Sequence, residues 1–285
     1  MEVLKAPRRR FTALADLPCY GDLVAGFDDG LTYIYSNVWN RGVTWSELPP
    51  QGGVTDIAVF SDTRLAISYN DSYVRFYDIK IPKHLGIAKI DDGYVNVLAV
   101  LNDNRRIAFG ANDGKIYLWD KITGDYVGRW VASLDAGIRS LTVLSDGRLA
   151  SGSDDGVIKV WDPTTLWDWQ YRIQAHKANV TCLAALPDGR LASSSNDGFV
   201  CVWNGTDLKW SKYLAADKVD ALAVLPGGRL AGGAGDGSIY LWKTSSGKCH
   251  KVLTGHEDRV TAMTVLADGR LASASDDGTI RVWDV

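Results

Sequence analysis

The 285-residue sequence predicts an all-β fold, a seven-bladed β-propeller, from three observations. One sequence block returns seven times, and its second turn recurs every 39 to 42 residues. That spacing is close to the period of about 40–45 residues typical of repeats that each form one four-stranded antiparallel blade. Within each block, short alternating apolar runs are separated by turn residues, which is typical of β-hairpins. Residues 1–285 are therefore expected to form one propeller domain.

The seven copies of the block differ in how closely they agree. The stronger copies span residues 144–162, 186–204, 225–243 and 266–284. The weaker copies span residues 17–36, 60–78 and 101–120. Their second turns are centred on Gly30, Ser72, Gly114, Gly156, Gly198, Gly237 and Gly278. Asp-Gly between alternating apolar runs predicts a tight hairpin turn in which both residues take a positive φ.

The strands of the last blade can be placed from its apolar pattern. Strands a, b and c are expected at residues 260–266, 270–275 and 279–284, and residues 248–254, before this blade, are expected to form the strand d of the preceding blade. The last strand c ends the sequence, so this blade needs its fourth strand from elsewhere. Residues 3–4 and 11–13 align with 252–253 and 260–262. Residues 1–10 are therefore expected to form strand d of the last blade and close the ring.

Composition restricts the function classes. A net charge of −3 and a pI near 5.8 give no sign of the basic face of a nucleic-acid binder. No apolar run reaches the roughly 18–20 residues of a membrane span, and the N-terminus lacks the apolar region of a signal peptide. The four cysteines show no CxxC pair. We expect a cytoplasmic protein that binds neither nucleic acid nor membrane.

The motifs within the block point to a family. Gly-His precedes strand a, Ser lies in strand b, Asp lies in the b–c turn, and Trp-Asp ends strand c. In this respect the chain resembles the WD40-repeat family over essentially its whole length. The resemblance implies structural tetrads at His176, Ser193, Asp197 and Trp203 and at His256, Ser273, Asp277 and Trp283.

Other blades depart from this pattern. The His position reads Pro7, Pro50, Asp91, Leu134 and Ala215. The terminal Trp becomes Tyr35 and Tyr77 in the first two blades. The turn Asp is kept throughout, at Asp29, Asp71, Asp113, Asp155, Asp197, Asp236 and Asp277. Blades 1 and 2 are therefore expected to be the least regular.

The tetrad residues are not read as a catalytic triad. Ser193, His176 and Asp197 are of the right types, but the same set recurs in the last blade. A nucleophile needs a single exposed position beside an oxyanion hole, which a repeated blade feature does not provide. Asp154-Asp155-Gly156 lacks the further ligands of a calcium loop. We expect no catalytic residue, no cofactor and no metal ion.

Family resemblance implies a binding face at the d–a and b–c loops. Three positions in each blade point there: the two flanks of the first apolar residue of strand a, and the residue before the turn Asp. The expected partner-binding residues are Arg10, Tyr94, Asn96, Arg139, Asp154, Asn179, Asp220, Arg259 and Asp276. Arginine and tyrosine are frequent interface hot spots. Because arginine binds carboxylate and phosphate groups bidentately, an acidic or phosphorylated peptide is the expected ligand.

Six tryptophans lie outside the repeat position, in d-strand regions. They are Trp39, Trp45, Trp130, Trp167, Trp169 and Trp210. Trp167, Trp169, Tyr171 and Ile173 alternate and so share one face of a strand. Two interpretations stay open, packing against the neighbouring blade or an exposed aromatic patch on the rim.

The leading functional hypothesis is a non-catalytic scaffold or adaptor that binds other proteins or peptides, as a monomer or as a subunit of a larger complex. One alternative is a substrate receptor of a ubiquitin ligase. The Trp-Asp-x-Arg motif frequent in that group is replaced by Trp119-Asp-Lys-Ile and Trp161-Asp-Pro-Thr. A propeller enzyme, a sugar-binding lectin and a designed propeller without a natural partner are further alternatives. Fold alone does not decide among them.

Overall fold

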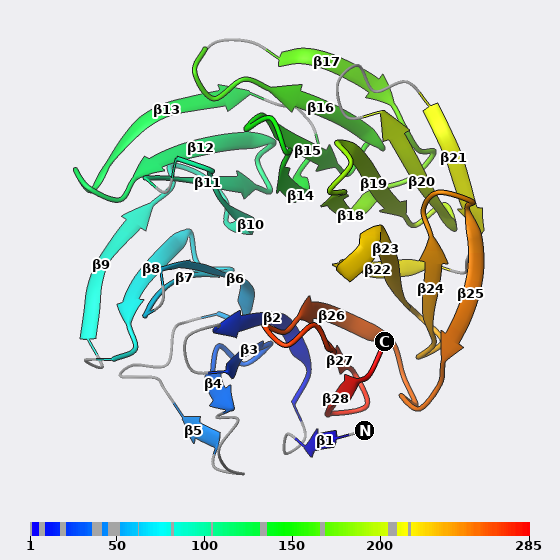
Figure 1. The fold of residues 1–285 in the computed structure, drawn as a ribbon. Coiled ribbons are helices and arrows are strands. Elements are labelled where there is room, and N and C mark those ends of the chain that lie inside the picture. Colours follow the sequence, from blue (N-terminus) through cyan, green and yellow to red (C-terminus); the bar gives the residue numbers. More distant parts are fainter. Residues whose placement is uncertain are drawn as a thin grey trace.

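Seven four-stranded antiparallel sheets surround a central axis in the computed structural model (Figure 1). The description covers residues 2–5, 9–17, 21–35, 42–44, 52–61, 63–80, 83–103, 105–131, 136–165, 169–204, 210–215 and 218–285. The architecture is the seven-bladed propeller that the repeat predicts. No α-helix occurs in these ranges. Accordingly, no helix in them is long and apolar enough to span a bilayer.

Each blade runs from strand a near the axis to strand d at the rim. The a strands are β2 (Phe11–Leu17), β6 (Val54–Ser61), β10 (Val95–Val100), β14 (Ile138–Val143), β18 (Val180–Ala185), β22 (Val219–Leu225) and β26 (Val260–Val265). The b strands are β3 (Asp22–Phe27), β7 (Arg64–Tyr69), β11 (Arg106–Ala111), β15 (Leu149–Ser153), β19 (Arg190–Ser195), β23 (Arg229–Ala234) and β27 (Leu271–Ser275). A 3₁₀ turn, η1 (Pro226–Gly228), links β22 to β23.

The outer two strands complete each sheet. The c strands are β4 (Thr32–Tyr35), β8 (Tyr73–Asp78), β12 (Lys115–Asp120), β16 (Val157–Trp161), β20 (Phe199–Asn204), β24 (Ile239–Lys243) and β28 (Thr279–Trp283). The d strands of blades 1 to 6 are β5 (Gly42–Thr44), β9 (Lys83–Lys89), β13 (Asp125–Val131), β17 (Trp169–Gln174), β21 (Trp210–Ala215) and β25 (Lys248–Leu253). Blade 7 takes its fourth strand from β1 (Glu2–Lys5).

The ring closes as the sequence predicts. β1 pairs antiparallel with β28, and Leu4 lies opposite Ile280. In blade 6 the equivalent pair is Leu253 opposite Ile239, so the closing strand keeps the blade register. The strand covers Glu2–Lys5, while residues 1 and 6–8 of the expected segment lie outside the described residues.

The b–c turns differ from the predicted type. All seven central residues have a positive φ, including Ser72 at 69°, but none of the preceding aspartates does. In blade 1, Gly30 N–H donates to Phe27 O at 3.1 Å and Phe27 N–H donates to Leu31 O at 3.0 Å. These bonds indicate a type I turn followed by one left-handed residue. The prediction that both turn residues take a positive φ is therefore wrong, because Asp-Gly also fits this longer loop.

The core lies between neighbouring blades. At the junction of blades 2 and 3, Val74 and Phe76 pack against Ile107 and Phe109 in one buried cluster. Close approach needs glycine at some strand b positions. A Cβ on Gly110 would lie 2.6 Å from the Ile138 Cγ2 atom of the next blade, well inside van der Waals contact. Such packing fixes each blade against the next and holds the loops at the two ends of the ring in register.

Candidate binding face and the turn aspartates

The aspartate of every b–c turn makes the same local hydrogen bond. Its Oδ1 atom accepts from the backbone N–H two residues later, at 2.8 to 3.2 Å. A short carboxylate that binds its own backbone in this way stabilises the turn. This bond explains why all seven repeats keep an aspartate here, although the His and Trp positions vary.

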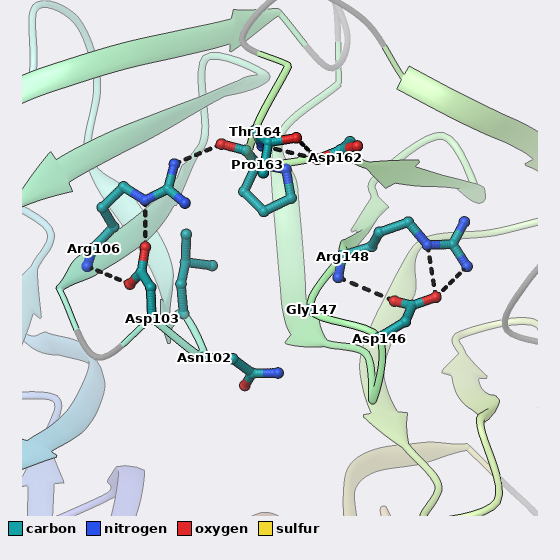
Figure 2. A pocket seen from close by; sticks show the side chains of 10 residues that line it. Asn102, Asp103, Arg106, Asp146, Gly147, Arg148, Asp162, Pro163 and Thr164 are labelled. Atoms are coloured by element: carbon teal, nitrogen blue, oxygen red, sulfur yellow. Dashed lines mark hydrogen bonds and ion pairs between the residues drawn. The ribbon is translucent and has the colours of Figure 1, made fainter.

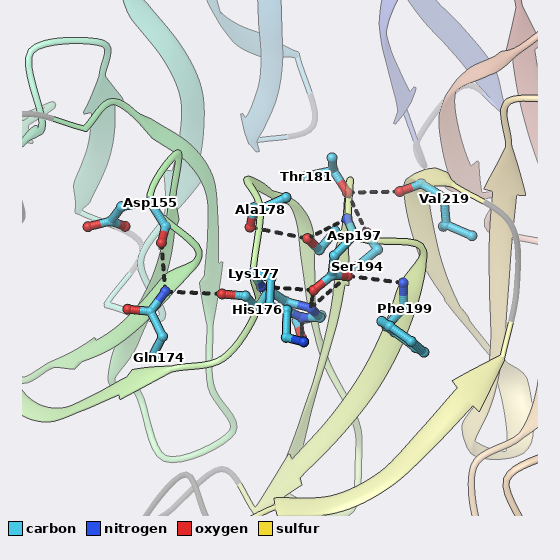
Figure 3. A network of polar contacts seen from close by, with 12 residues as sticks. Asp155, Gln174, His176, Lys177, Ala178, Thr181, Ser194, Asp197, Phe199 and Val219 are labelled. Atoms are coloured by element: carbon cyan, nitrogen blue, oxygen red, sulfur yellow. Dashed lines mark hydrogen bonds and ion pairs between the residues drawn. The ribbon is translucent and has the colours of Figure 1, made fainter.

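Blade 5 brings the four expected tetrad residues together. Figure 3 shows His176, which precedes strand a, beside Asp197 of the b–c turn. His176 Nδ1 lies 3.1 Å from Asp197 Oδ2, and Nε2 lies 2.7 Å from Ser193 Oγ. Trp203 Nε1–H donates to the same Ser193 oxygen at 2.8 Å. The four side chains form one chain of hydrogen bonds from strand c to the turn.

Blade 7 repeats this geometry. His256 Nδ1 lies 2.9 Å from Asp277 Oδ2 and Nε2 lies 2.8 Å from Ser273 Oγ, which also accepts from Trp283 Nε1–H at 2.8 Å. Thr279 Oγ1 adds a contact of 2.6 Å to the Asp277 carboxylate. Because a tryptophan N–H only donates, the serine hydroxyl accepts from it and donates to His Nε2. The His Nδ1–H then donates to the aspartate.

Electrostatics favour a neutral histidine in this arrangement. Burial lowers the pKa of His176 and of His256, although the neighbouring aspartate opposes this. The pKa of Asp277 is lowered to about 2, because the bonds from Thr279, the Glu257 backbone and His256 outweigh its desolvation. Ser193 and Ser273 are completely buried. Neither hydroxyl can reach a substrate in this arrangement.

Other blades give the turn aspartate other partners. Arg9 pairs with Asp29 at 2.6 Å in blade 1. Lys115 and the Tyr117 hydroxyl contact Asp113 in blade 3 at 2.7 and 2.9 Å. In blade 4, Trp161 Nε1–H donates to Ser151 Oγ at 2.9 Å, so this blade keeps the bond between tryptophan and serine without a histidine. Of the residues at the other His positions, Pro7, Pro50 and Leu134 lie outside the described residues.

One backbone hydrogen bond defines the expected binding face in all seven blades. The residue before each turn Asp donates its N–H to the carbonyl of the residue before strand a, at 2.9 to 3.2 Å. The pairs are Asp28–Arg10, Asn70–Gly53, Asn112–Tyr94, Asp154–Gly137, Asn196–Asn179, Gly235–Lys218 and Asp276–Arg259. The bond places two of the three expected positions side by side at one end of each blade.

The third position behaves differently. In blades 2, 3 and 5 its side chain reaches the backbone of the next blade: Thr55 Oγ1 donates to Val95 O, Asn96 Nδ2 to Ile138 O, and Thr181 Oγ1 to Val219 O, at 2.5 to 2.8 Å. These bonds join neighbouring blades. Asn96 is therefore already engaged in holding blade 3 to blade 4, a role that the sequence does not reveal because it depends on the adjacent repeat.

Blades 4 and 5 share a polar cluster on this face. Arg139 Nε donates to Asp154 Oδ1 at 2.7 Å, and Asn179 Nδ2 donates to the same oxygen at 2.7 Å. The three expected residues thus lie together across the junction of the two blades. The Arg139 guanidinium is paired internally, which the sequence does not show.

A second cluster joins blades 6 and 7. Arg259 Nε lies 3.2 Å from Asp276 Oδ2 and 4.0 Å from Asp220 Oδ2. Lys218 Nζ lies 3.9 Å from Asp220 Oδ1. Burial raises the pKa of Asp220 despite the two nearby cations. Of the two other expected residues, Arg10 is exposed and Tyr94 is half-buried, and Tyr94 N–H donates to Asn112 Oδ1 at 2.7 Å.

The aromatic residues of strand β17 lie at the rim. Trp169 and Tyr171 are each more than one third exposed, which agrees with an aromatic patch at the rim. Lys159 Nζ lies 5.6 Å from the Trp169 ring centroid, and Arg148 Cζ lies 5.6 Å from the Tyr171 ring centroid. Ile173 is half-buried against the blade core. Trp167, Trp39 and Trp45 lie outside the described residues.

Comparison with known proteins identifies the family. The family model for the WD domain, G-beta repeat, matches residues 85–120, 126–162, 167–204 and 247–284, which together make up just over half of the sequence. The chain belongs to the WD40-repeat family. WD40 propellers are typically scaffolds for interactions between proteins and are generally not catalytic.

Solved structures show the same WD40 architecture. One chain of a crystal structure of the mitotic checkpoint complex superposes with a TM-score of 0.90 at 21% identity, and the match covers all of this WD40 chain and 91% of that chain. At this identity the likeness shows the fold alone. No curated protein matches the sequence. Within the described residues, no cluster of three or more His, Cys, Asp or Glu side chains is placed to hold a metal ion.

Proposed function

We propose that this WD40 propeller is a non-catalytic scaffold that binds a protein or peptide on the face formed by the d–a and b–c loops. The seven equivalent backbone bonds on that face carry the proposal. They hold two positions per blade in fixed geometry, while the residues at those positions differ from blade to blade. A rigid frame that presents variable side chains on a ring of loops is a common arrangement for recognition.

The tetrads support a structural role. The Ser-His-Asp set occurs in blades 5 and 7 with the same hydrogen-bond partners, and both serine oxygens are occupied by histidine and tryptophan. A hydrolase would need one serine at an exposed position beside oxyanion donors. We therefore assign these residues to blade packing and the exposed loop residues to binding.

The two arginine clusters suggest the chemistry of the ligand. Arg139 and Arg259 are 46% and 43% exposed although each contacts an aspartate. Exposed ion pairs contribute only about 0–1 kcal/mol, so a ligand anion displaces the internal carboxylate at small cost. Arginine also binds carboxylate and phosphate bidentately. We propose an acidic or phosphorylated peptide that spans the junction of blades 4 and 5 and that of blades 6 and 7.

A peptide array tests this proposal. The intact chain is applied to peptides synthesised in three matched forms, with Ser, phospho-Ser or Glu at one position. We expect binding of the phosphorylated or acidic form, and a loss of at least about tenfold in the Arg139→Glu and Arg259→Glu double variant, as for two charge-assisted contacts. The control is Arg172→Glu with Arg270→Glu, which changes the net charge equally outside the face.

Two results would count against it. If the double variant binds the same peptides as the wild type, the arginines are not part of the site. If the control variant loses binding equally, the effect comes from net charge and not from this face. Circular dichroism of each variant confirms that the propeller is intact.

A further inference from the structure

An arginine at the start of strand b ties neighbouring blades together on the opposite end of the ring. Arg106 Nη1–H donates to the Pro163 carbonyl of blade 4 at 2.5 Å, as Figure 2 shows. Arg190 donates to the Thr244 carbonyl of blade 6 at 3.1 Å, and Arg229 to the Val285 carbonyl of blade 7 at 3.3 Å. In each case the acceptor lies two residues after the last aromatic residue of strand c. We call this bond the arginine clamp.

Blade 2 has the same arginine but a different contact. Arg64 lies opposite Asp78 in the sheet, as Arg106 lies opposite Asp120 in blade 3. For Arg64, the acceptor equivalent to those of the arginine clamp would be the carbonyl of Lys121, which lies two residues after Trp119 in blade 3. Within the part of the chain that the structure describes, Arg64 instead contacts the Asp78 carboxylate, at 3.5 Å, and its side chain is 52% exposed. The clamp is therefore not made between blades 2 and 3.

A cavity of about 460 Å³ opens where the clamp is missing. Its floor is aromatic, formed by Phe60, Phe76 and Trp119, and the Phe76 and Trp119 rings stack with centroids 5.9 Å apart. Its walls are Ile87 and Ile122, which are 52% and 72% exposed. Apolar side chains so exposed beside a hollow are typical of a binding site.

The corresponding cavities at clamped junctions have another character. The cavity between blades 3 and 4, of about 470 Å³, is lined by Asp103, Arg106, Asp146 and Arg148. Those four charged side chains are paired with one another, Arg106 with Asp103 at 2.5 Å and Arg148 with Asp146 at 2.6 Å. The cavity between blades 2 and 3 is instead lined mainly by apolar residue types, and its arginine, Arg64, is half-exposed beside Asp78.

Two cationic side chains lie at the edge of the cavity between blades 2 and 3. Arg64 lines it, and Lys121 Nζ lies 5.5 Å from the centroid of the Phe60 ring. An apolar hollow with arginine and lysine at its edge is complementary to an apolar side chain followed by an anion.

The backbone beside the cavity favours an extended peptide as the occupant. Strand β9, which carries Leu85 and Ile87, is the outermost strand of blade 2. An edge strand has one row of N–H and C=O groups free to pair with an added strand. Gly86, between the two apolar residues, also lines the cavity. A peptide along β9 therefore gains both main-chain hydrogen bonds and side-chain burial.

We propose that the cavity between blades 2 and 3 is a second interaction site, which binds an extended peptide segment with bulky apolar side chains next to a carboxylate. The apolar side chains enter the hollow over Phe60 and Trp119, and Arg64 binds the carboxylate. The site lies at the a–b and c–d turn end of the blades and does not use the loops that carry Arg139 and Arg259. A propeller with two such sites joins two partners.

An array of acetylated octapeptides probes this site directly. Each peptide has two residues chosen from Leu, Ile, Phe and Trp at spacings of one to four, flanked by Glu in one set and by Gln in its twin. The strongest pair is then measured in solution by fluorescence polarisation with the intact chain. We expect the Glu peptide to bind roughly fivefold more tightly than its Gln twin, the size of one exposed ion pair.

Variants locate the binding. The Arg64→Gln protein is expected to lose this preference and to bind both twins like the weaker one. The Ile87→Ser and Ile122→Ser double variant is expected to lose about tenfold or more for both twins, because two apolar contacts are removed. Val252→Ser is the matched control, since Val252 lies on the outermost strand of blade 6 and is 44% exposed. The Arg139→Glu and Arg259→Glu variant should bind both twins as the wild type does.

Three results would overturn the proposal. One is that no peptide of either set binds. Another is that the isoleucine variant binds like the Val252→Ser control. The third is a concentration-dependent dimer in sedimentation velocity that the isoleucine variant abolishes, because the occupant would then be a second copy of the chain. If the face formed by the d–a and b–c loops proves not to bind a peptide, this second site is unaffected. The two proposals can therefore be contradicted independently of each other.

Discussion

Blades 7 and 2 each have an aspartate at the equivalent position of the b–c turn, and they stabilise it with different side chains. In blade 7, neutral His256 bridges Asp277 to buried Ser273. In blade 2, Arg75 of strand β8 binds Asp71 through both guanidinium nitrogens, at 3.1 and 2.6 Å.

The surroundings of the two partners differ accordingly. The Arg75 guanidinium carbon lies 4.7 Å from the centroid of the Tyr69 ring and 5.4 Å from that of Tyr73. The histidine comes from the loop before strand a, whereas the arginine comes from the same hairpin as the aspartate. The two blades thus keep the same turn carboxylate and bind it with donors of different chemistry from different parts of the blade.

The largest expected effect concerns the serine of the tetrad. Ser273→Ala removes the acceptor of Trp283 Nε1–H and the donor to His256 Nε2, and leaves both groups buried. We expect a loss of about 2–4 kcal/mol in the free energy of unfolding, measured by urea denaturation. Ser151→Ala in blade 4 is the matched control, because Ser151 accepts from Trp161 and has no histidine partner. Equal losses in the two variants would show that the histidine bond contributes nothing.

The second prediction uses pH to separate the histidine blades from blade 2. Since burial lowers the pKa of His176 and His256, the unfolded chain binds protons more readily than the folded one. Their contribution is fully present above the unfolded pKa of about 6.5 and is lost as the pH falls below it, by at most about 1.4 kcal/mol per pH unit for each histidine.

The measurement compares the wild type with the His176→Gln and His256→Gln variant between pH 7.5 and 5. We expect the stability of the wild type to fall more steeply. Asp56 acts in the opposite direction, since burial raises its pKa to about 6 and folding then favours its protonated form. Because Asp56 is present in both proteins, its effect cancels in the difference. Parallel curves would contradict the prediction.

The third prediction concerns the arginine blade. Arg75→Ala removes a partly exposed ion pair and the cation–π contacts with Tyr69 and Tyr73, which together correspond to about 1–2 kcal/mol. Because arginine keeps its charge, this loss should be the same at pH 6 and pH 8. It should shrink in 1 M NaCl, where exposed charges are screened. A loss that grows on acidification would mean that blade 2 also depends on a titrating partner.

The smallest expected effect is at the b–c turn of blade 2. Ser72 takes the left-handed conformation that glycine takes in the other six blades, and its hydroxyl donates to the Gly93 carbonyl. Ser72→Gly and Ser72→Ala both remove that bond, but only glycine relieves the left-handed backbone. Thermal unfolding should show the glycine variant to be more stable than the alanine variant by about 1 kcal/mol. Equal melting temperatures would show that the turn is free of strain.

Local patterns in the sequence were sufficient to predict the blades. Repeated turns and alternating strands determine each hairpin, and the register of Leu4 follows from its alignment with Leu253. Asp-Gly alone does not determine the turn type, because two hairpin loops of different length accept it.

Contacts between blades could not be predicted from such local patterns. The bonds from Asn96 to Ile138 and from Asn179 to Asp154 depend on how one repeat meets the next. The cavity between blades 2 and 3 likewise combines residues of two repeats. One sequence feature does point to this cavity. An arginine begins strand b in blades 2, 3, 5 and 6, and its bonding partner differs in blade 2.

The closing strand has a consequence for how the chain folds. Blades 1 to 6 are built from consecutive strands, so each can form from nearby residues. Blade 7 instead pairs Glu2 with Val282, the strand pairing of greatest sequence separation among the described residues. Folding slows as contacts become less local, because the loop must be closed before the contact is gained. During synthesis, β1 can pair with β28 only after the strands of all the other blades have been made, so we expect ring closure to be a late step in folding.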